Sequence, residues 1–142
     1  MTVSSVQAEV QKLIRDTLLA DTTVMSMVNG IWDDVSDSNP FAEPKEAYIT
    51  IGPSDVVSDD ADCIIGGEIT FQLDAWSRTQ GKVGCRKIVD AMKVALHGKD
   101  LDLTNNALVE IRVDFRRVID DLDGITKHGL VMVTTLIEEA TV

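Results

Sequence analysis

Residues 68–98, EITFQLDAWSRTQGKVGCRKIVDAMKVALHG, combine a strand pattern with a helix pattern. The first nine residues alternate strictly between two kinds of side chain. Ile69, Phe71, Leu73 and Ala75 share one side, and Thr70, Gln72, Asp74 and Trp76 share the other. An alternation with a period of two predicts a strand that is buried on one face.

From residue 85 onward the apolar positions change to helical spacing. The apolar stripe consists of Cys85, Ile88, Val89, Met92 and Leu96. Gly98 follows at the place where a glycine commonly ends a helix. The sequence therefore predicts a helix over about residues 81–97, whose apolar side packs on the same core as the preceding strand.

The N-terminal third predicts a second amphipathic helix and a short strand. Its stripe consists of Val6, Val10, Leu13, Ile14 and Leu18. Ser4 and Gln7 fit a capping box, so we expect the helix at about residues 4–20. Asp21 caps a short helical turn that ends at Asn29–Gly30, and a short strand is expected within residues 31–35.

Residues 36–67 alternate between loop and strand signals. The proline-containing segment 36–46 predicts a loop, and AYITI at 47–51 predicts a strand that Pro53 ends. The following acidic stretch, residues 54–67, ends in two glycines. It is expected to form either the tip of a long β-hairpin or a loop.

Two further strands are expected near the C-terminus. In residues 107–118 the alternation places Val109, Ile111, Val113 and Phe115 inward and Glu110, Arg112, Asp114 and Arg116 outward. In residues 129–137 both sets of positions are apolar or threonine. A strand of that kind is covered on both faces, either because it is central or because another subunit closes its second face.

The expected order is helix, turn, three strands, helix and two strands. Runs of strands joined by short polar turns favour a mostly antiparallel sheet in an α+β domain. Two amphipathic helices are enough to cover one face of that sheet but not both. The length of 142 residues favours one domain over residues 1–142.

Composition narrows the classes of function. The net charge of −11 repels polyphosphate, so tight binding of nucleic acid is disfavoured. Cys63 and Cys85 form no CxxC pair and are expected to be free thiols in a reducing compartment. The polar N-terminus does not resemble a signal peptide, and no apolar run is long enough for a membrane helix. We therefore expect a soluble cytoplasmic product without a membrane partner.

The stretch IDDLDGITKHG at residues 119–129 has the appearance of a calcium loop. If Gly124 takes the sixth position of an EF-hand loop, Ile119 and Leu130 occupy the first and twelfth positions. Both positions require oxygen ligands, so the calcium interpretation fails there. Asp123–Gly124 between two alternating runs instead predicts a hairpin turn. No metal ion is expected.

Nothing in the sequence favours catalysis or a cofactor. His97 and His128 have no cysteine or histidine at zinc-ligand spacing, and neither a nucleotide-binding glycine motif nor a nucleophile elbow occurs. Adjacent carboxylates such as Asp120 and Asp121 point to opposite faces of a strand, which makes them poor acid–base pairs. The only basic concentration we identify is Arg112, Arg116 and Arg117, expected to pair with acidic groups of the same chain or of a neighbour.

Several segments, in order, resemble the tail terminator or tail-completion proteins of phages with long non-contractile tails. They are LLADTTVMSMVNGIWDDV, PKEAYITIG, the stretch 68–98 and DDLDGITKHGLVMV, which together span about residues 8–137. In that family a strand ends in Trp-Ser, a helix ends in a Leu-His-Gly pattern, and an Asp-x-Asp-Gly-x-x-x-His-Gly turn precedes the last strand.

The resemblance implies a structural protein of the virion and not an enzyme. It implies a homohexameric ring that caps the tail tube, ends tube polymerisation and joins the tail to the head connector. The implied partners are the major tail tube protein and the connector or stopper protein, with DNA passing through the lumen. The implied location is the head–tail junction of a phage, a prophage or a gene-transfer particle, after assembly in the bacterial cytoplasm.

Charged residues are the candidate contacts within such a ring or along its lumen. They are Asp55, Asp59, Asp60, Asp62, Arg112, Arg116, Asp120, Asp121 and Asp123. A second interpretation is a small acidic ligand- or calcium-binding module that uses the aspartates of residues 58–62 or 120–124. A third is a hydrolase that uses His97 or His128.

Overall fold

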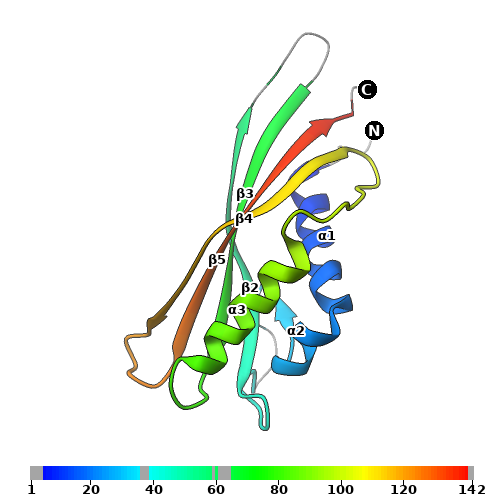
Figure 1. The fold of residues 1–142 in the computed structure, drawn as a ribbon. Coiled ribbons are helices and arrows are strands. Elements are labelled where there is room, and N and C mark those ends of the chain that lie inside the picture. The colour runs from blue at the N-terminus through cyan, green and yellow to red at the C-terminus, as the bar shows by residue number, and fades with distance from the viewer. Residues whose placement is uncertain (1–4, 36–38, 59, 61–64, 141–142) are drawn as a thin grey trace.

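The computed structural model describes residues 5–35, 39–58, 60 and 65–140. In chain order the elements are α1 (Val6–Ala20), α2 (Thr22–Met27), β1 (Ile31–Trp32), β2 (Ala47–Ser58), β3 (Ile65–Ser77), α3 (Val83–Leu96), β4 (Ala107–Asp120) and β5 (Lys127–Glu139). This order confirms the expected succession of helices and strands (Figure 1).

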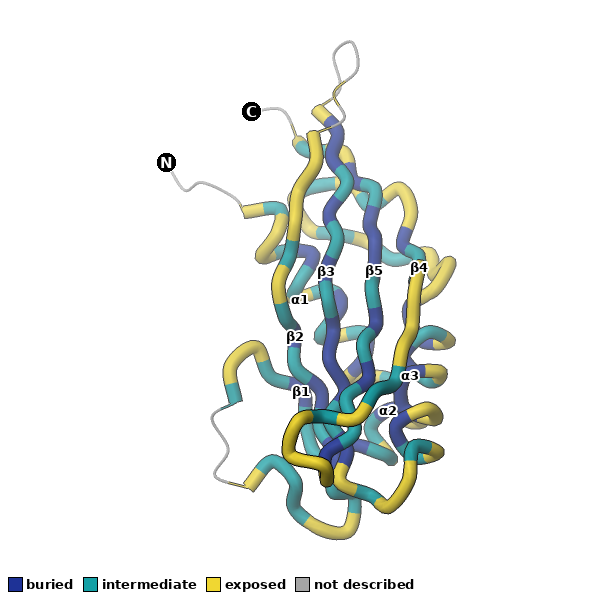
Figure 2. Tube along the Cα trace, turned by 90° about the vertical axis from the view of Figure 1, so that its left-hand side faces the viewer, coloured by how far each residue is buried: buried dark blue, intermediate teal, exposed yellow. Residues whose placement is uncertain are grey.

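The strands form one five-stranded sheet in the order β1-β2-β3-β5-β4. Within the described residues, the short β1 pairs in parallel with β2, and the other strand pairings are antiparallel. The helices lie together on one face of the sheet, as both views of the fold show (Figures 1 and 2). The predicted α+β class, with amphipathic helices on one face of a mostly antiparallel sheet, is confirmed.

Ser5 caps helix α1, one residue later than the capping box at Ser4 predicted. The Ser5 hydroxyl oxygen accepts a hydrogen bond from the Ala8 N–H at 3.2 Å, which satisfies one of the unpaired amides of the first turn. Val10, Ile14 and Leu18 are fully buried, which confirms the predicted stripe. Leu13 lies partly outside it.

Helix α3 agrees with the prediction to within two residues at each end. Its stripe from Cys85 to Leu96 is buried against the sheet. Gly98 follows with φ of +67°, a left-handed conformation that favours glycine. Its N–H donates to the Ile111 carbonyl at 2.8 Å, which ties the end of α3 to β4.

Strand β3 supplies the centre of the core, as its alternation predicts. Ile69, Leu73 and Ala75 are fully buried, and Phe71 is 2% exposed. Burying side chains of the size of leucine or phenylalanine stabilises a fold by about 1.5–3 kcal/mol each. This row therefore fixes the register of β3, because a shift by one residue would expose all four side chains.

The prediction that Pro53 ends the second strand is wrong. Strand β2 continues to Ser58, and its register against β3 shifts between Ile51 and Ser54. The irregularity accommodates Gly52 and Pro53. They lie on the outer edge of β2, which β1 covers at Ile49 and Thr50. Proline is tolerated there because it needs no partner for an N–H. Residues 54–58 and 65–67 thus form a long β-hairpin, one of the two predicted alternatives.

The inward set predicted for β4 is correct only at its centre. Ile111 is 1% exposed and Val113 is partly buried, but Val109 is 61% exposed and Phe115 is 49% exposed. Register shifts occur between Leu108 and Glu110 and again between Val113 and Phe115. Each bulge adds a residue to β4 and reverses which side chains face the helices.

Strand β5 lies between β3 and β4, which confirms its predicted interior position. Its helix-facing residues Val131, Val133 and Ile137 are buried, whereas Leu130 and Met132 on the other face are partly exposed. No helix of the described residues covers this second face (Figure 2). The turn before β5 has Gly124 at φ of +74°, and β4 and β5 pair on either side of it, which confirms the predicted hairpin.

Candidate functional site

The sheet face opposite the helices, here called the open face, has no helix of the described residues over it (Figure 2). It carries Thr70, Gln72, Asp74 and Trp76 from β3 and Leu130, Met132 and Leu136 from β5, because these alternate with the buried rows. Phe115 joins them from β4, in register with Met132. Aliphatic, aromatic and polar side chains mix here as they do in protein–protein interfaces.

Arg112 is the centre of an ion-pair network on the open face. It contacts Asp114 at 2.7 Å, Glu110 at 3.4 Å and Glu68 of β3 at 3.6 Å. The hydrogen bond to Asp114 raises the pKa of Arg112, and the adjacent carboxylates raise it further. Burial raises the pKa of Asp114, but hydrogen bonds from Thr134 and Arg112 outweigh that effect and lower it overall. Arg112 therefore joins β4 to β3 within one chain.

Arg116 lies on the other side of β4 from Arg112, although the sequence pattern predicts both on one face. The bulge between Val113 and Phe115 reverses the alternation, so Arg116 faces α3. Its guanidinium donates to Asp90 of α3 at 2.6 Å. The two predicted arginines are therefore not brought together.

A cleft between α3 and β4 surrounds this ion pair. We call it the arginine cleft. It has a volume of about 330 Å³ and is lined by Arg86, Val89, Asp90, Arg116, Arg117 and Val118. Among the described residues, neither Arg86 nor Arg117 has an acidic group within ion-pair distance. Three arginines and one aspartate thus border the cleft, with Arg117 at its edge because it pairs with Leu130 of the open face.

Sequence reasoning missed Arg86 as a member of this group. Helical spacing shows only that Arg86 lies on the side of α3 away from the apolar stripe. The cluster of basic residues that the sequence predicts lies entirely on β4. The available signal was the spacing of Lys82, Arg86 and Asp90, which puts them on one helical face. Helical periodicity does not determine which strand this face of α3 approaches, because that depends on how α3 packs on the sheet.

The predicted acidic residues fall at opposite ends of the sheet. Asp55 is exposed on β2, and Asp60 is exposed with its carboxylate accepting from the Gly66 N–H at 3.2 Å. Asp59 and Asp62 lie outside the described residues. Figure 1 places this β2–β3 hairpin at the end of the molecule opposite the β4–β5 turn. The acidic candidates therefore belong to two separate surfaces.

The three aspartates of the β4–β5 turn have different roles. Asp120 contacts Lys127 at 2.6 Å and Lys82 at 3.3 Å, and these hydrogen bonds lower its pKa. Asp121 contributes backbone bonds that close the turn. Asp123 accepts from the N–H groups of Ile125 and Thr126, both at 2.8 Å, and from the Thr126 hydroxyl at 2.6 Å. Donors already occupy its oxygens, so this carboxylate organises the turn.

Replacing Asp123 by alanine tests that role. The hydrogen bonds from Thr126 and Ile125 lower the pKa of Asp123 to about 2. Because the folded pKa lies below the unfolded one, this stabilisation is complete above about pH 4 and is lost as the pH falls through the folded pKa. We expect Asp123→Ala to lower the melting midpoint by a few degrees at neutral pH. The difference from the wild type should shrink as the pH falls from about 4 towards 2.

Asp121→Ala is the matched control for that measurement. Among the described residues the Asp121 side chain makes no hydrogen bond, so its removal should leave the melting midpoint nearly unchanged. Equal losses for the two variants at all pH values would contradict the assigned role of Asp123. Circular-dichroism melts over the acid range make the comparison.

The histidines serve the fold in the geometry observed. His128 bonds Asp74 at 2.7 Å and stacks on Trp76 with 4.0 Å between ring centroids. Within the part of the chain that the structure describes, no serine, threonine or cysteine bonds to His128. The His97 Nδ1 accepts from the Val113 N–H at 2.9 Å and so adds to the tie between α3 and β4. Over the same residues, no cluster of three or more potential metal ligands occurs.

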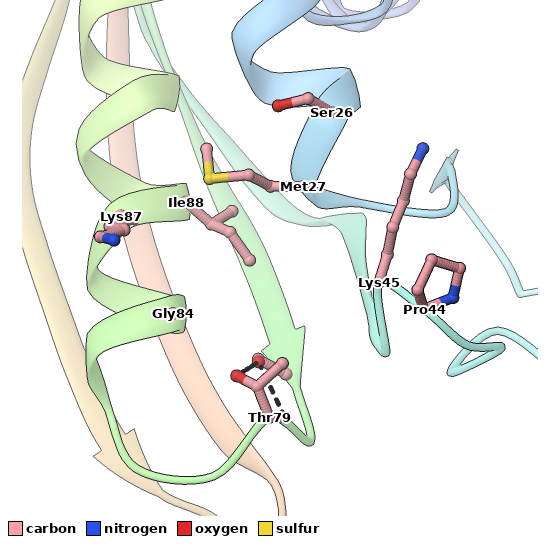
Figure 3. A pocket seen from close by; sticks show the side chains of 9 residues that line it. Ser26, Met27, Pro44, Lys45, Thr79, Gly84, Lys87 and Ile88 are labelled. Carbon is pink, nitrogen blue, oxygen red and sulfur yellow. Dashed lines mark hydrogen bonds between the residues drawn. The ribbon is translucent and has the colours of Figure 1, made fainter.

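A more apolar pocket of about 420 Å³ lies between α2, α3 and the segment before β2 (Figure 3). It is lined by Ser26, Met27, Pro44, Lys45, Ser77, Thr79, Gly84, Lys87 and Ile88. The Ser77 and Thr79 hydroxyls bond each other at 2.8 Å, and Lys45 donates to the Met25 carbonyl at 2.9 Å. These polar groups are already paired within the chain.

Within the described residues, no helix is long and apolar enough to cross a membrane.

Comparison with known proteins gives a consistent result. The chain matches the family described as Tail completion protein gp17 over residues 12–138. It is 26% identical over 133 residues to the tail completion protein gp17 of Bacillus phage SPP1, covering 94% of this chain and 95% of that protein.

The fold is also similar to that of a solved virion protein. A chain in the structure titled "Virion of native gene transfer agent (GTA) particle" superposes with a TM-score of 0.84 at 19% identity, covering 96% of this chain and 99% of that one. Because the identity is low, this likeness concerns the fold. The family match over residues 12–138 shows that this chain belongs to the tail completion protein gp17 family.

Proposed function

We propose that this protein is a structural tail terminator. It caps the tail tube, ends tube polymerisation and joins the tail to the head connector at the head–tail junction. The observation that carries the proposal is the family match across residues 12–138, almost the whole chain. The alignment with the SPP1 protein, which covers 95% of that protein, supports the same role.

The working form in this proposal is a homohexameric ring. The open face, with partly exposed Leu130 and Met132, and the arginine cleft are two different surfaces on different sides of the sheet. In a head-to-tail ring one surface of a subunit contacts a different surface of the next, and the ring closes when the rotation permits. The ring's partners are the major tail tube protein on one side and the connector or stopper protein on the other.

Charge suits the passage of DNA through such a ring. Each chain carries −11, so six chains carry six times −11, or −66. A lumen lined with this sign repels phosphate and lets DNA pass without specific binding. The proposed role is therefore passive towards DNA.

The proposal is non-enzymatic and needs no cofactor or metal. His128 and Asp74 form the pair that most resembles a catalytic dyad. The Asp74 carboxylate bonds His128 and also accepts a hydrogen bond from Gln72 of the same sheet at 3.0 Å. The His128 imidazole stacks on the Trp76 side chain of β3, which holds the imidazole against the sheet. We assign this pair to the structure of the open face. The protein is assembled in the bacterial cytoplasm and resides in the virion tail.

Deleting the gene tests the proposal. Without a terminator, tubes have no cap and no docking surface, so we expect heads and tails to remain unjoined and tubes to vary abnormally in length. Electron microscopy of lysates measures both properties, and a plasmid copy of the gene should restore joined particles. Joined particles with tails of normal length after deletion would overturn the proposal.

A further inference from the structure

The distribution of charge along the chain is strongly uneven. Residues 78–99 contain six basic residues and one acidic residue, a local charge of +5 in a chain of −11. Residues 53–68 contain five acidic residues and no basic residue, a local charge of −5. The two segments flank the same strand, β3, but the fold separates them. The first contains α3, and the described residues of the second include the end of β2 and the start of β3.

The hairpin has the properties of a contact segment. We call its described residues 53–58, 60 and 65–68 the acidic arm. Asp55 and Asp60 are exposed on it, and the apolar side chains Val56, Val57 and Ile65 are 44%, 64% and 42% exposed. Figure 1 shows this hairpin extending past the helices at one end of the molecule. Exposed apolar and acidic side chains on one projecting element favour burial against a partner.

The arginine cleft offers the complementary surface. Asp90 pairs with Arg116, so Arg86 inside the cleft and Arg117 at its edge have no acidic partner among the described residues. Val89 and Val118 add an apolar wall. Arginine binds carboxylates through two parallel hydrogen bonds, which gives such a contact direction as well as energy.

We propose that the arginine cleft binds the acidic arm of a neighbouring copy of this chain. The inference rests on the proposed ring and names its contact. Within one chain the arm lies at the end of the sheet away from the lower half of α3, where the cleft is formed (Figure 1). The two surfaces of one copy are therefore free to engage two different neighbours, as a head-to-tail assembly requires.

A second copy fits the cleft better than duplex DNA does. Binding of DNA requires many phosphates to be neutralised at once, and the whole chain carries −11. The cleft itself contains Asp90, which repels phosphate but can stay paired with Arg116 while a short acidic segment binds beside it. A cleft of about 330 Å³ has room for a few side chains from the acidic arm, whereas a DNA duplex needs a much longer surface.

Charge reversal on each side tests the contact. One variant combines Arg86→Glu with Arg117→Glu, and the other combines Asp55→Lys with Asp60→Lys. Self-association of the full chain is measured by sedimentation velocity over a wide range of concentrations. Each variant should associate about tenfold or more weakly than the wild type, because close charge pairs at interfaces have coupling of this size or larger. An equimolar mixture should recover association, since each reversed surface then meets a reversed partner.

Two controls separate loss of this contact from a change in net charge and from misfolding. Lys12→Glu with Lys99→Glu gives the same change in net charge as Arg86→Glu with Arg117→Glu, but away from the cleft, and should retain wild-type association. Melting curves must show that all variants fold. Association of the wild type should also weaken as salt rises from roughly 0.05 to 0.5 M, because the screening length shortens several-fold.

Four results would overturn the inference. They are a wild type that does not associate even at the highest concentration, reversed variants that associate normally, a mixture that does not recover, and salt-sensitive binding of a short DNA duplex that Arg86→Glu with Arg117→Glu abolishes. The last result would assign the cleft to nucleic acid. None of them bears on the deletion experiment, so a monomeric chain that still completes tails would reject this contact and leave the proposed function standing.

Discussion

Replacing Gly129 by alanine is expected to destabilise the fold by about 3 kcal/mol, at the upper end of the cost of overpacking a core. A methyl group at this position would lie 2.5 Å from Val89 Cγ1 and 3.1 Å from Cys85 Sγ, both on α3. It would also meet Ala75 on the neighbouring strand at 3.3 Å. Helix α3 can approach β5 this closely because the sheet presents only glycine and alanine there.

The clash cannot be relieved by a simple side-chain movement. Val89 is β-branched and has one strongly preferred rotamer in a helix, so α3 as a whole would have to shift. A loss of this size lowers the melting midpoint by roughly 10 °C in a chain of this length. Thermal or urea unfolding followed by circular dichroism measures it.

Gly67→Ala is the matched control for Gly129→Ala. Gly67 is also a buried strand glycine, but its nearest new contact would be the flexible tip of Ile137 at 3.4 Å. We expect a change within about 0.5 kcal/mol. Adding Val89→Ala to Gly129→Ala should recover part of the loss, because the two substitutions share one contact. A Gly129→Ala protein as stable as the wild type would show that α3 does not lie against β5 in this way.

Leu73→Ala is the second substitution with a large expected effect. Leu73 is fully buried in the middle of β3, where Ile51 of β2 and Val131 of β5 pair beside it. Its removal loses apolar burial and leaves a cavity that the sheet cannot close, because hydrogen bonds on both edges hold β3 in place. The expected cost is about 2–5 kcal/mol, measured by urea unfolding at equilibrium.

Leu122→Ala makes the same chemical change on the surface. Leu122 lies fully exposed in the β4–β5 turn, so its truncation should alter the free energy of unfolding by no more than about 0.5 kcal/mol. Similar losses at residues 73 and 122 would contradict the assignment of the inward row of β3. They would also remove the basis for the register of the sheet.

Local patterns predict correctly those elements whose buried face is determined by their own residues. The alternation around Phe71 indicates the inward face of β3, the stripe through Met92 indicates the buried side of α3, and Asp123–Gly124 indicates the hairpin turn. The first two signals repeat without interruption over the whole element, and the third is a dipeptide with a strong preference for a hairpin turn. Burial of the apolar set then leaves one favourable orientation.

The predictions that failed depend on contacts between elements. Pro53 predicts a strand end, but the edge of β2 tolerates it through a register irregularity. Phe115 and Arg116 exchange faces because a bulge in β4 resets the alternation, and bulges are fixed by pairing with β5. Arg86 joins Arg116 only because α3 crosses the sheet beside β4. The sequence therefore predicts the fold class well and the arrangement of the charged surfaces poorly.

The most direct test of the terminator role is cryo-electron microscopy of purified particles at the head–tail junction. We expect one ring of six copies between the last ring of the tail tube and the connector, with this fold fitted into each subunit. Density for the chain elsewhere in the particle, or a junction in which the tube meets the connector without it, would contradict the account.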